Sequence, residues 1–264
     1  MNIDRLAAFP CNLALYAILL VTCISCSTMA KARPDGTEVP ATLRGVRRIV
    51  CLGDSITEQG GQPGGYVNLL QQYLTTLYPG QSIQVYNAGI SGHKATDMQA
   101  RFQRDVLSKN PDLVTISVGV NDVWHGFYDN HPAGDGPLGV PLNVYRNKVV
   151  QMVEAAKASK AKVVLISPTL IHENLAGPEN AKLETYVAEM RAIARETGSG
   201  FVDLNAAFKE LIRAYQKRAG RTSNLLTTDG VHMNAAGNRV MAYGILRGLG
   251  VPDKSISDLK LDSK

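Results

Sequence analysis

"CLGDSITEQG", residues Cys51 to Gly60, follows the apolar run "RRIV" and leads into a segment with helical spacing. Glycine and aspartate favour the tight turn that such a change of direction needs, and Ser55 then lies where the helix begins. The exposed N–H groups of a helix start favour negative charge. Ser55 is therefore either a residue of the turn or a nucleophile, and motifs elsewhere in the sequence are needed to distinguish these interpretations.

Five short runs rich in valine and isoleucine alternate with longer segments of helical spacing. The runs are "RRIVCLG" (47–53), "SIQVYNAG" (82–89), "LVTISVG" (113–119), "AKVVLISP" (161–168) and "GFVDL" (200–204). The helical segments cover residues 66–78, 95–108, 144–159, 181–197, 206–220 and 234–250. Nearly continuous apolar character is typical of strands that are covered on both faces. The alternation therefore predicts an α/β fold with a doubly wound parallel sheet.

The bulk composition fits one globular domain. The chain has 264 residues, of which 45% are apolar, so it can bury a sizeable core. Its net charge of +5 is dispersed, with no run of lysine or arginine longer than two residues. Dispersed charge of this size favours a solvated surface over a nucleic-acid interface, and we expect no nucleic-acid partner.

The N-terminal 30 residues differ from the rest of the chain. One arginine precedes the apolar run "LALYAILLVTCIS", and "STMA" follows it. This pattern predicts a signal peptide cleaved after Ala30. "LVTC" and "CISC" resemble a lipoprotein lipobox imperfectly, and a retained membrane anchor is a third alternative, although the run is short for a span of about 20 residues. Each alternative places the folded body outside the cytoplasm, in the periplasm, outside the cell or lipid-anchored at the envelope.

The remaining boundaries follow from composition. Residues 31–45 are polar, contain two prolines and are expected to form a linker, followed by one domain over residues 46–250 and a C-terminal tail over 251–264. After cleavage at Ala30 only Cys51 of the four cysteines remains, so no internal disulfide is expected. Cys51 lies in an apolar run and is expected to be a small core residue.

The loops that follow the predicted strands carry the polar residues with catalytic potential. Right-handed crossovers bring the carboxyl ends of parallel strands to one edge of the sheet, where ligands bind. The loops at this edge contain Gly53-Asp54-Ser55, then Asn87, Gly89 and Gly92 in "NAGISG", then Asn121 and Asp122 in "GVND", and the segment before the last helix contains Asp229 and His232 in "TTDGVHMN". Each motif alone is common, but their shared edge predicts a single site.

These residues suit nucleophilic catalysis. A serine hydroxyl needs a base, and His232 is the candidate. An imidazole needs a carboxylate to fix its tautomer, and Asp229 lies three residues before it, close enough to converge from one turn. The N–H groups of Ser55 and Gly89 and the amide of Asn121 would form a three-donor oxyanion hole.

Two other aspartates, Asp54 and Asp122, are alternative candidates for the carboxylate that orients His232. Asp54 adjoins the nucleophile and is expected to brace the turn at the border of the substrate site. Asp122 adjoins the oxyanion donor Asn121. Among the three, Asp229 alone has the local spacing that reaches His232.

The four blocks together resemble those of the SGNH hydrolases, also called GDSL-type esterases and lipases. The serine block is "GDSIT", the glycine block "NAGISG", the asparagine block "GVND" and the last block "DGVH", and the resemblance spans about residues 47 to 248. Ile56 stands where the name-giving motif has leucine, an apolar exchange that affects no catalytic group. The resemblance implies a flavodoxin-like three-layer α/β/α sandwich, no metal or cofactor, and ester hydrolysis through an acyl-enzyme.

The loop "WHGFYDNHPAGDGPLGVPL" (124–142) follows the asparagine block and is long and rich in glycine and proline. Long loops in compact domains are often binding loops, so Trp124, Phe127 and Tyr128 either contact a sugar ring or acyl group or pack the loop onto the domain. The segment "GDGPLG" within it does not open a helix and is not a dinucleotide site. The histidine spacing in "HGFYDNH" fits no standard metal site.

These features predict an exported serine esterase that acts on a small-molecule or glycan ester. Export, a polar aromatic loop and the lack of a long apolar groove favour short acyl esters, such as acetyl groups on carbohydrates. Hydrolysis of longer acyl chains, as by a lysophospholipase or thioesterase, is the alternative within this class. A non-catalytic carbohydrate-binding domain of the same fold is the alternative outside it.

Overall fold

The computed structural model describes residues 38–219 and 224–259. The predicted signal peptide and residues 31–37 of the predicted linker lie outside the described residues. Five strands form one parallel sheet: β1 (Arg48–Gly53), β2 (Gln84–Gly89), β3 (Leu113–Ser117), β4 (Lys162–Ile166) and β5 (Gly200–Val202). All five apolar runs of the sequence therefore contain a strand, and the predicted α/β class is confirmed.

The strand order is β2-β1-β3-β4-β5. The chain passes from β1 to β2 on one side and then returns to place β3 on the other side of β1. Ligand sites of such sheets lie outside the carboxyl ends of the strands where this reversal occurs. At that edge Gly53 of β1 pairs with Gly89 of β2, and Leu52 pairs with Ile116 of β3. The loops after β1, β2 and β3 consequently leave the sheet next to one another.

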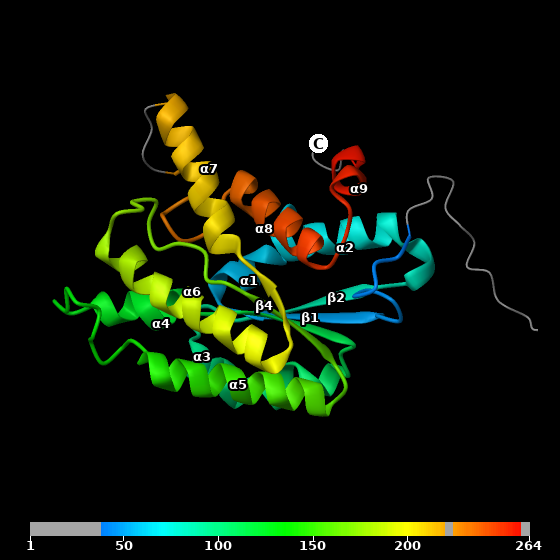
Figure 1. Ribbon diagram of the computed structural model, residues 1–264, viewed down its shortest axis with the longest axis horizontal. Coiled ribbons are helices and arrows are strands. Elements are labelled where there is room, and N and C mark those ends of the chain that lie inside the picture. The colour runs from blue at the N-terminus through cyan, green and yellow to red at the C-terminus, as the bar shows by residue number, and fades with distance from the viewer. Residues whose placement is uncertain (1–37, 220–223, 260–264) are drawn as a thin grey trace, which may run out of the picture.

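Helices cover both faces of the sheet and make the three layers that the fold class implies (Figure 1). On one side lie α1 (Ser55–Gly60), α2 (Tyr66–Leu77), α7 (Leu204–Ala219) and α8 (Ala235–Gly248), and on the other lie α3 (Ala95–Asp105), α5 (Leu142–Ala158) and α6 (Pro178–Thr197). The short helices α4 (Val120–Trp124) and α9 (Asp253–Asp258) complete the described chain. Asn234 caps α8, because its side chain accepts a hydrogen bond from the Gly237 amide at 3.0 Å.

The core extends beyond the predicted limits of the domain, 46–250. Leu43, in the predicted linker, is fully buried, and Thr42 donates a hydrogen bond to the carbonyl of Leu249. Ile256, in the predicted tail, is 5% exposed in α9. Buried side chains therefore occur on both sides of the predicted limits, in segments whose composition is otherwise polar.

The structure also describes the environment of Cys51 and the hydrophobicity of the helices. Cys51 is a free, buried residue of β1, and burial raises the pKa of its thiol to about 11, which leaves it unreactive. Among the helices that the structure describes, none is both long and apolar enough to cross a membrane.

Candidate active site

Ser55 lies at the junction of β1 and α1, the point where the chain turns from the buried strand into the helix. Asp54 caps this helix, since its carboxylate accepts a hydrogen bond from the Ile56 amide at 2.9 Å. The turn leaves the Ser55 side chain 8% exposed at the carboxyl edge of the sheet. Asp54 itself is 4% exposed, and its bond to the Ile56 amide fits the predicted role of bracing the turn at Ser55.

Ser55, His232 and Asp229 form a continuous chain of hydrogen bonds. The Oγ of Ser55 lies 2.8 Å from Nε2 of His232, and Nδ1 of His232 lies 2.6 Å from Oδ2 of Asp229. The segments that carry these residues are 177 positions apart in the chain. Because a carboxylate only accepts, Nδ1 carries the proton and Nε2 is left with a lone pair toward the serine hydroxyl.

The Asp229 carboxylate is fixed by its own loop. Its Oδ1 accepts hydrogen bonds from the amides of Val231 at 3.0 Å and His232 at 2.8 Å, while its Oδ2 accepts from the imidazole. Partial burial acts to raise the pKa of this carboxyl, but the hydrogen bonds from the His232 ring and the two amides lower it to about 2. Asp229 is therefore charged at neutral pH and can stabilise an imidazolium.

Asn121 lies in α4, which follows β3 in the chain. Its side chain is almost completely buried, and Nδ2 donates one hydrogen bond to the carbonyl of His93 at 3.1 Å. An amide nitrogen has two hydrogens, so this bond orients the group and leaves a second donor. The loop after β2 and the loop after β3 are thereby joined at the edge where Ser55 lies.

Gly89 does not have the role that the sequence suggested. Gly89 is the last residue of β2, and its amide donates to Oδ1 of Asn87 at 2.8 Å. The N–H of Gly89 is therefore not available to a substrate oxygen. A Cβ at this position would lie 2.1 Å from the amide nitrogen of Glu58. Glycine is needed here because the strand passes close to α1, which is a packing requirement.

Gly92, in the same "NAGISG" segment, has the free donor that Gly89 lacks. Its φ of +77° favours glycine, and its amide donates to no other residue in the described part of the chain. Its neighbours are tied to the site on both sides: the Ser91 amide donates to Glu58 of α1 at 2.9 Å, and the His93 carbonyl accepts from Asn121. Two glycines three positions apart could not be distinguished without knowing where the strand ends.

Arg101 of α3 is a functional residue that sequence reasoning missed. It is 5% exposed and donates to the carbonyls of Gly53 at 2.9 Å and Ala88 at 2.8 Å, and its Nε lies 2.9 Å from Nδ1 of His93. It also pairs with Asp105 at 3.1 Å. One buried cation thus joins the loops after β1 and β2. A signal was present, because an arginine occupies the buried stripe of an otherwise amphipathic helix.

Asp122 is buried beside Asn121. Its Oδ1 accepts from the Ala95 amide at 3.0 Å, while Oδ2 has no hydrogen-bond partner within the described chain. Burial raises the pKa of Asp122 to about 7 and that of Asp54 to about 6. The described contacts of these two aspartates do not include a hydrogen bond to His232, so neither takes the position that Asp229 has.

The loop aromatics divide into two groups. Trp124 packs edge-on against His172, with 5.8 Å between ring centroids, and against Tyr128 at 5.7 Å. His172 adjoins the catalytic loop, since a Cβ at Gly230 would lie 2.6 Å from its Nδ1. Tyr128 is 38% exposed. Trp124, Tyr128 and His172 thus form a partly exposed ring cluster beside the segment that carries Asp229 and His232.

Phe127 belongs to the second group, which packs the loop onto the domain. A Cβ at Gly134 would lie 2.3 Å from its ring, so the loop folds tightly over it. Lys182 of α6 donates to the carbonyls of Ala133 at 3.2 Å and Gly134 at 2.5 Å. Of the three predicted aromatics, Phe127 therefore has a packing role, while Trp124 and Tyr128 border the site. Within residues 38–219 and 224–259, no group of three or more His, Cys, Asp or Glu residues is placed to hold a metal ion.

Comparison with known proteins identifies the family of the chain. The family model described as "GDSL-like Lipase/Acylhydrolase family" matches residues 51–240. An acetylxylan esterase of Geobacillus stearothermophilus is 33% identical over 218 residues, which cover 77% of this chain and 94% of that protein. The solved structure of a catalytic mutant of this esterase superposes with a TM-score of 0.69 at 31% identity, over 78% of this chain and 95% of that one.

Two more distant relatives have other names. A mouse (Mus musculus) protein named isoamyl acetate-hydrolyzing esterase 1 homolog is 27% identical over 80% of this chain and 84% of its own length. An uncharacterized lipoprotein of Bacillus subtilis is 25% identical over 78% of this chain and 90% of its own length.

Proposed function

The chain belongs to the GDSL-like lipase/acylhydrolase family and is a carboxylic ester hydrolase, and from this premise we propose that it is a serine esterase that removes acetyl groups from carbohydrates. The chain of hydrogen bonds from Ser55 through His232 to Asp229 is the observation that supports a serine mechanism. A serine in such a chain can lose its proton to the ring as it attacks.

In the first half of the reaction the Ser55 Oγ attacks the ester carbonyl carbon, and its proton passes to Nε2 of His232. The tetrahedral intermediate then collapses: the bond from carbon to the alcohol oxygen breaks, and the alcohol leaves with the proton from His232. Asp229 stabilises the positively charged ring between these events. The product at this stage is an acetyl group on Ser55.

In the second half a water molecule attacks the acetyl carbonyl while His232 takes its proton. The bond between the carbonyl carbon and the Ser55 Oγ breaks, the proton returns to Oγ, and acetate is released. In both halves the negative oxygen of the intermediate is stabilised by the Ser55 amide, the second Nδ2 hydrogen of Asn121 and the Gly92 amide. Donors that are fixed in advance are effective because they need no reorganisation during the reaction.

The preference for acetyl esters of sugars has two supports. Two relatives have names that refer to acetyl esters, one on xylan and one on isoamyl alcohol. The partly exposed ring cluster of Trp124, Tyr128 and His172 lies beside the catalytic loop, and exposed aromatic rings suit the apolar face of a sugar. The proposed site of action is the cell exterior or envelope, and it rests on the N-terminal 30 residues, which lie outside the described part of the structure.

The proposal is tested by measuring kcat/KM for p-nitrophenyl esters from acetate to palmitate and for acetylated xylooligosaccharides. We expect acetate to be the preferred acyl group and the sugar esters to be deacetylated, with Ser55→Ala inactive on all of them. A preference for long chains would instead indicate a lysophospholipase-like or thioesterase-like enzyme. Sugar binding without hydrolysis, unchanged in Ser55→Ala, would indicate a binding domain.

A further inference from the structure

Glu173 is a buried carboxylate far along the chain from the catalytic residues. It lies in the loop between β4 and α6 and is 3% exposed. Its oxygens accept four hydrogen bonds: from the amides of Leu225 at 2.7 Å, Leu226 at 2.8 Å and Thr227 at 2.9 Å, and from the Thr227 hydroxyl at 2.8 Å. Burying a carboxylate is unfavourable unless such donors replace its water, so this arrangement is a specific one.

All four donors belong to the segment that leads directly into Asp229 and His232. The Thr227 hydroxyl, which donates to Glu173, also accepts from the Gly230 amide at 3.2 Å. Thr227 and Met233 form an antiparallel bridge, so the segment closes on itself around the two catalytic side chains. Glu173 therefore contacts the start of the loop that carries Asp229 and His232, the acid and the base of the proposed reaction.

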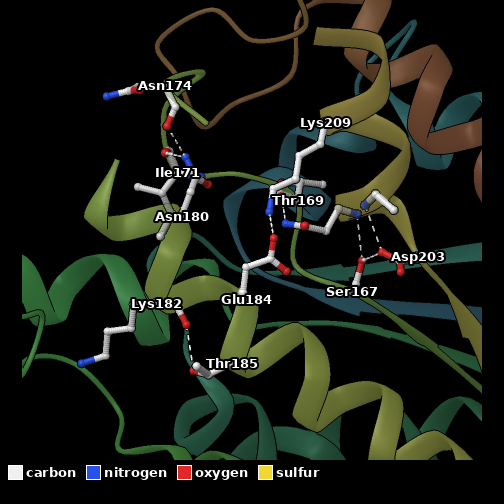
Figure 2. Close-up of polar contacts among 12 residues, drawn as sticks. Ser167, Thr169, Ile171, Asn174, Asn180, Lys182, Glu184, Thr185, Asp203 and Lys209 are labelled. Atoms are coloured by element: carbon white, nitrogen blue, oxygen red, sulfur yellow. Dashed lines mark hydrogen bonds and ion pairs between the residues drawn. The ribbon is translucent and has the colours of Figure 1, made fainter. Parts of the chain in front are cut away.

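The loop that carries Glu173 is itself held by Asn180, in the first turn of α6. The Asn180 side chain is 1% exposed and accepts from the Ile171 amide at 3.0 Å. It donates to the carbonyls of Ile171 at 2.7 Å, His172 at 3.2 Å and Asn174 at 2.9 Å. Figure 2 shows Asn180 reaching from the helix between Ile171 and Asn174. A rigid element of the scaffold is thus connected to the catalytic loop through Asn180, the 171–174 loop and Glu173.

We infer that Glu173 is a positioning residue, which holds the 225–232 segment so that His232 stays within hydrogen-bond reach of Ser55. This inference rests on the proposed function. Glu173 does not touch the reacting atoms and acts through Thr227 and the backbone of the loop. Displacement of a catalytic group by about 1 Å can lower a rate by about a hundredfold, so loss of this contact lowers kcat.

The test compares Glu173→Gln and Thr227→Val with the wild type. The enzyme is titrated with an organophosphonate that reacts with the active serine, and kcat for p-nitrophenyl acetate is expressed per titrated site, which removes the effect of misfolded protein. We expect Glu173→Gln to lower kcat about 10- to 100-fold with KM changed less than about twofold. Thr227→Val lowers kcat in the same way, and the two effects are less than additive in the double variant, because Glu173→Gln puts an amide N–H₂ opposite the Leu225 amide while Thr227→Val removes the hydroxyl donor of the same connection.

Two matched variants complete the design. Thr227→Ser keeps the hydroxyl and retains wild-type kcat per site, which keeps the test decisive if Glu173→Gln does not fold. Lys209→Met removes the ion pair between Lys209 of α7, whose side chain is 8% exposed, and Glu184 of α6, whose side chain is 55% exposed (Figure 2), and it leaves kcat per site unchanged.

The inference is overturned if Glu173→Gln behaves like Lys209→Met, or if Thr227→Val and Thr227→Ser have equal kcat per site. Failure of the proposed function is recognised separately, because Ser55→Ala would then keep its hydrolytic activity.

Discussion

Arg101 gives the sharpest test of how the site is built, through the substitution Arg101→Met. The change keeps most of the side-chain length but removes the donors to the buried carbonyls of Gly53 and Ala88. A buried acceptor that loses its partner costs about 1–3 kcal/mol, and the Gly53 carbonyl keeps its hydrogen bond from the Ile90 amide at 3.2 Å. The free energy of unfolding should therefore fall by roughly 1–4 kcal/mol. A domain of this size loses about 2–4 °C of melting temperature per kcal/mol, which predicts a decrease of roughly 2–16 °C.

Activity should fall as well, because Gly53 lies two residues before Ser55 and Arg101 also contacts the His93 ring, whose backbone carbonyl orients Asn121. Arg101→Lys should be intermediate, since an ammonium cannot reach two carbonyls in the planar geometry of a guanidinium. The control is Arg104→Met, because Arg104 also pairs with Asp105 but its side chain is 74% exposed.

Urea unfolding, followed by circular dichroism, and kcat for p-nitrophenyl acetate are measured on the three variants and the wild type. The control should change stability by less than about 0.5 kcal/mol, as is usual for exposed residues. The reasoning would be refuted if Arg101→Met changed stability as little as Arg104→Met and kept wild-type kcat.

Three further predictions concern the site itself. Asp229→Asn should lower kcat by about 10³–10⁴-fold with little change in KM, because the ring loses the partner that fixes its tautomer; steady-state kinetics measure this, and a loss below tenfold would contradict it. Asn121→Ala should lower kcat about 10²–10³-fold through loss of an oxyanion donor, whereas a rise in KM alone would assign Asn121 to ground-state binding. Burial raises the pKa of Asp122 from 3.8 to about 7, so the folded state binds the extra proton and this carboxyl lowers stability as pH rises through that window. Asp122→Asn should therefore remove part of the loss of stability between about pH 4 and about pH 7 in urea unfolding, and an unchanged slope would show that Asp122 does not titrate in this range.

Much of the fold could be predicted because its strands have a strong local signal. The runs around Val50, Val114 and Val164 are apolar at nearly every position, which is typical of a parallel sheet covered on both faces. The order of strands and helices then places the loops at one edge. The proximity of Ser55 and His232 could be predicted for the same reason, since topology alone brings their loops together.

The partners of the buried charged residues could not be predicted, although helical spacing places Arg101 on the buried stripe of α3. Glu173 and Arg101 are surface-type residues in composition, and their burial depends on carbonyls and amides supplied by distant segments. Gly89 and Gly92 have the same side chain and differ only in backbone direction and φ, which depend on where β2 ends. Such features arise from tertiary contacts, which the periodicity of the sequence does not specify.

The central claim is that the Ser55 hydroxyl is activated by His232 and Asp229. Reaction with an organophosphonate, followed by digestion and peptide mass spectrometry, tests it most directly. The account predicts one adduct per chain, located on Ser55, with labelling abolished in Ser55→Ala and strongly slowed in His232→Ala. An adduct on another residue, or equal labelling rates in the wild type and His232→Ala, would contradict it.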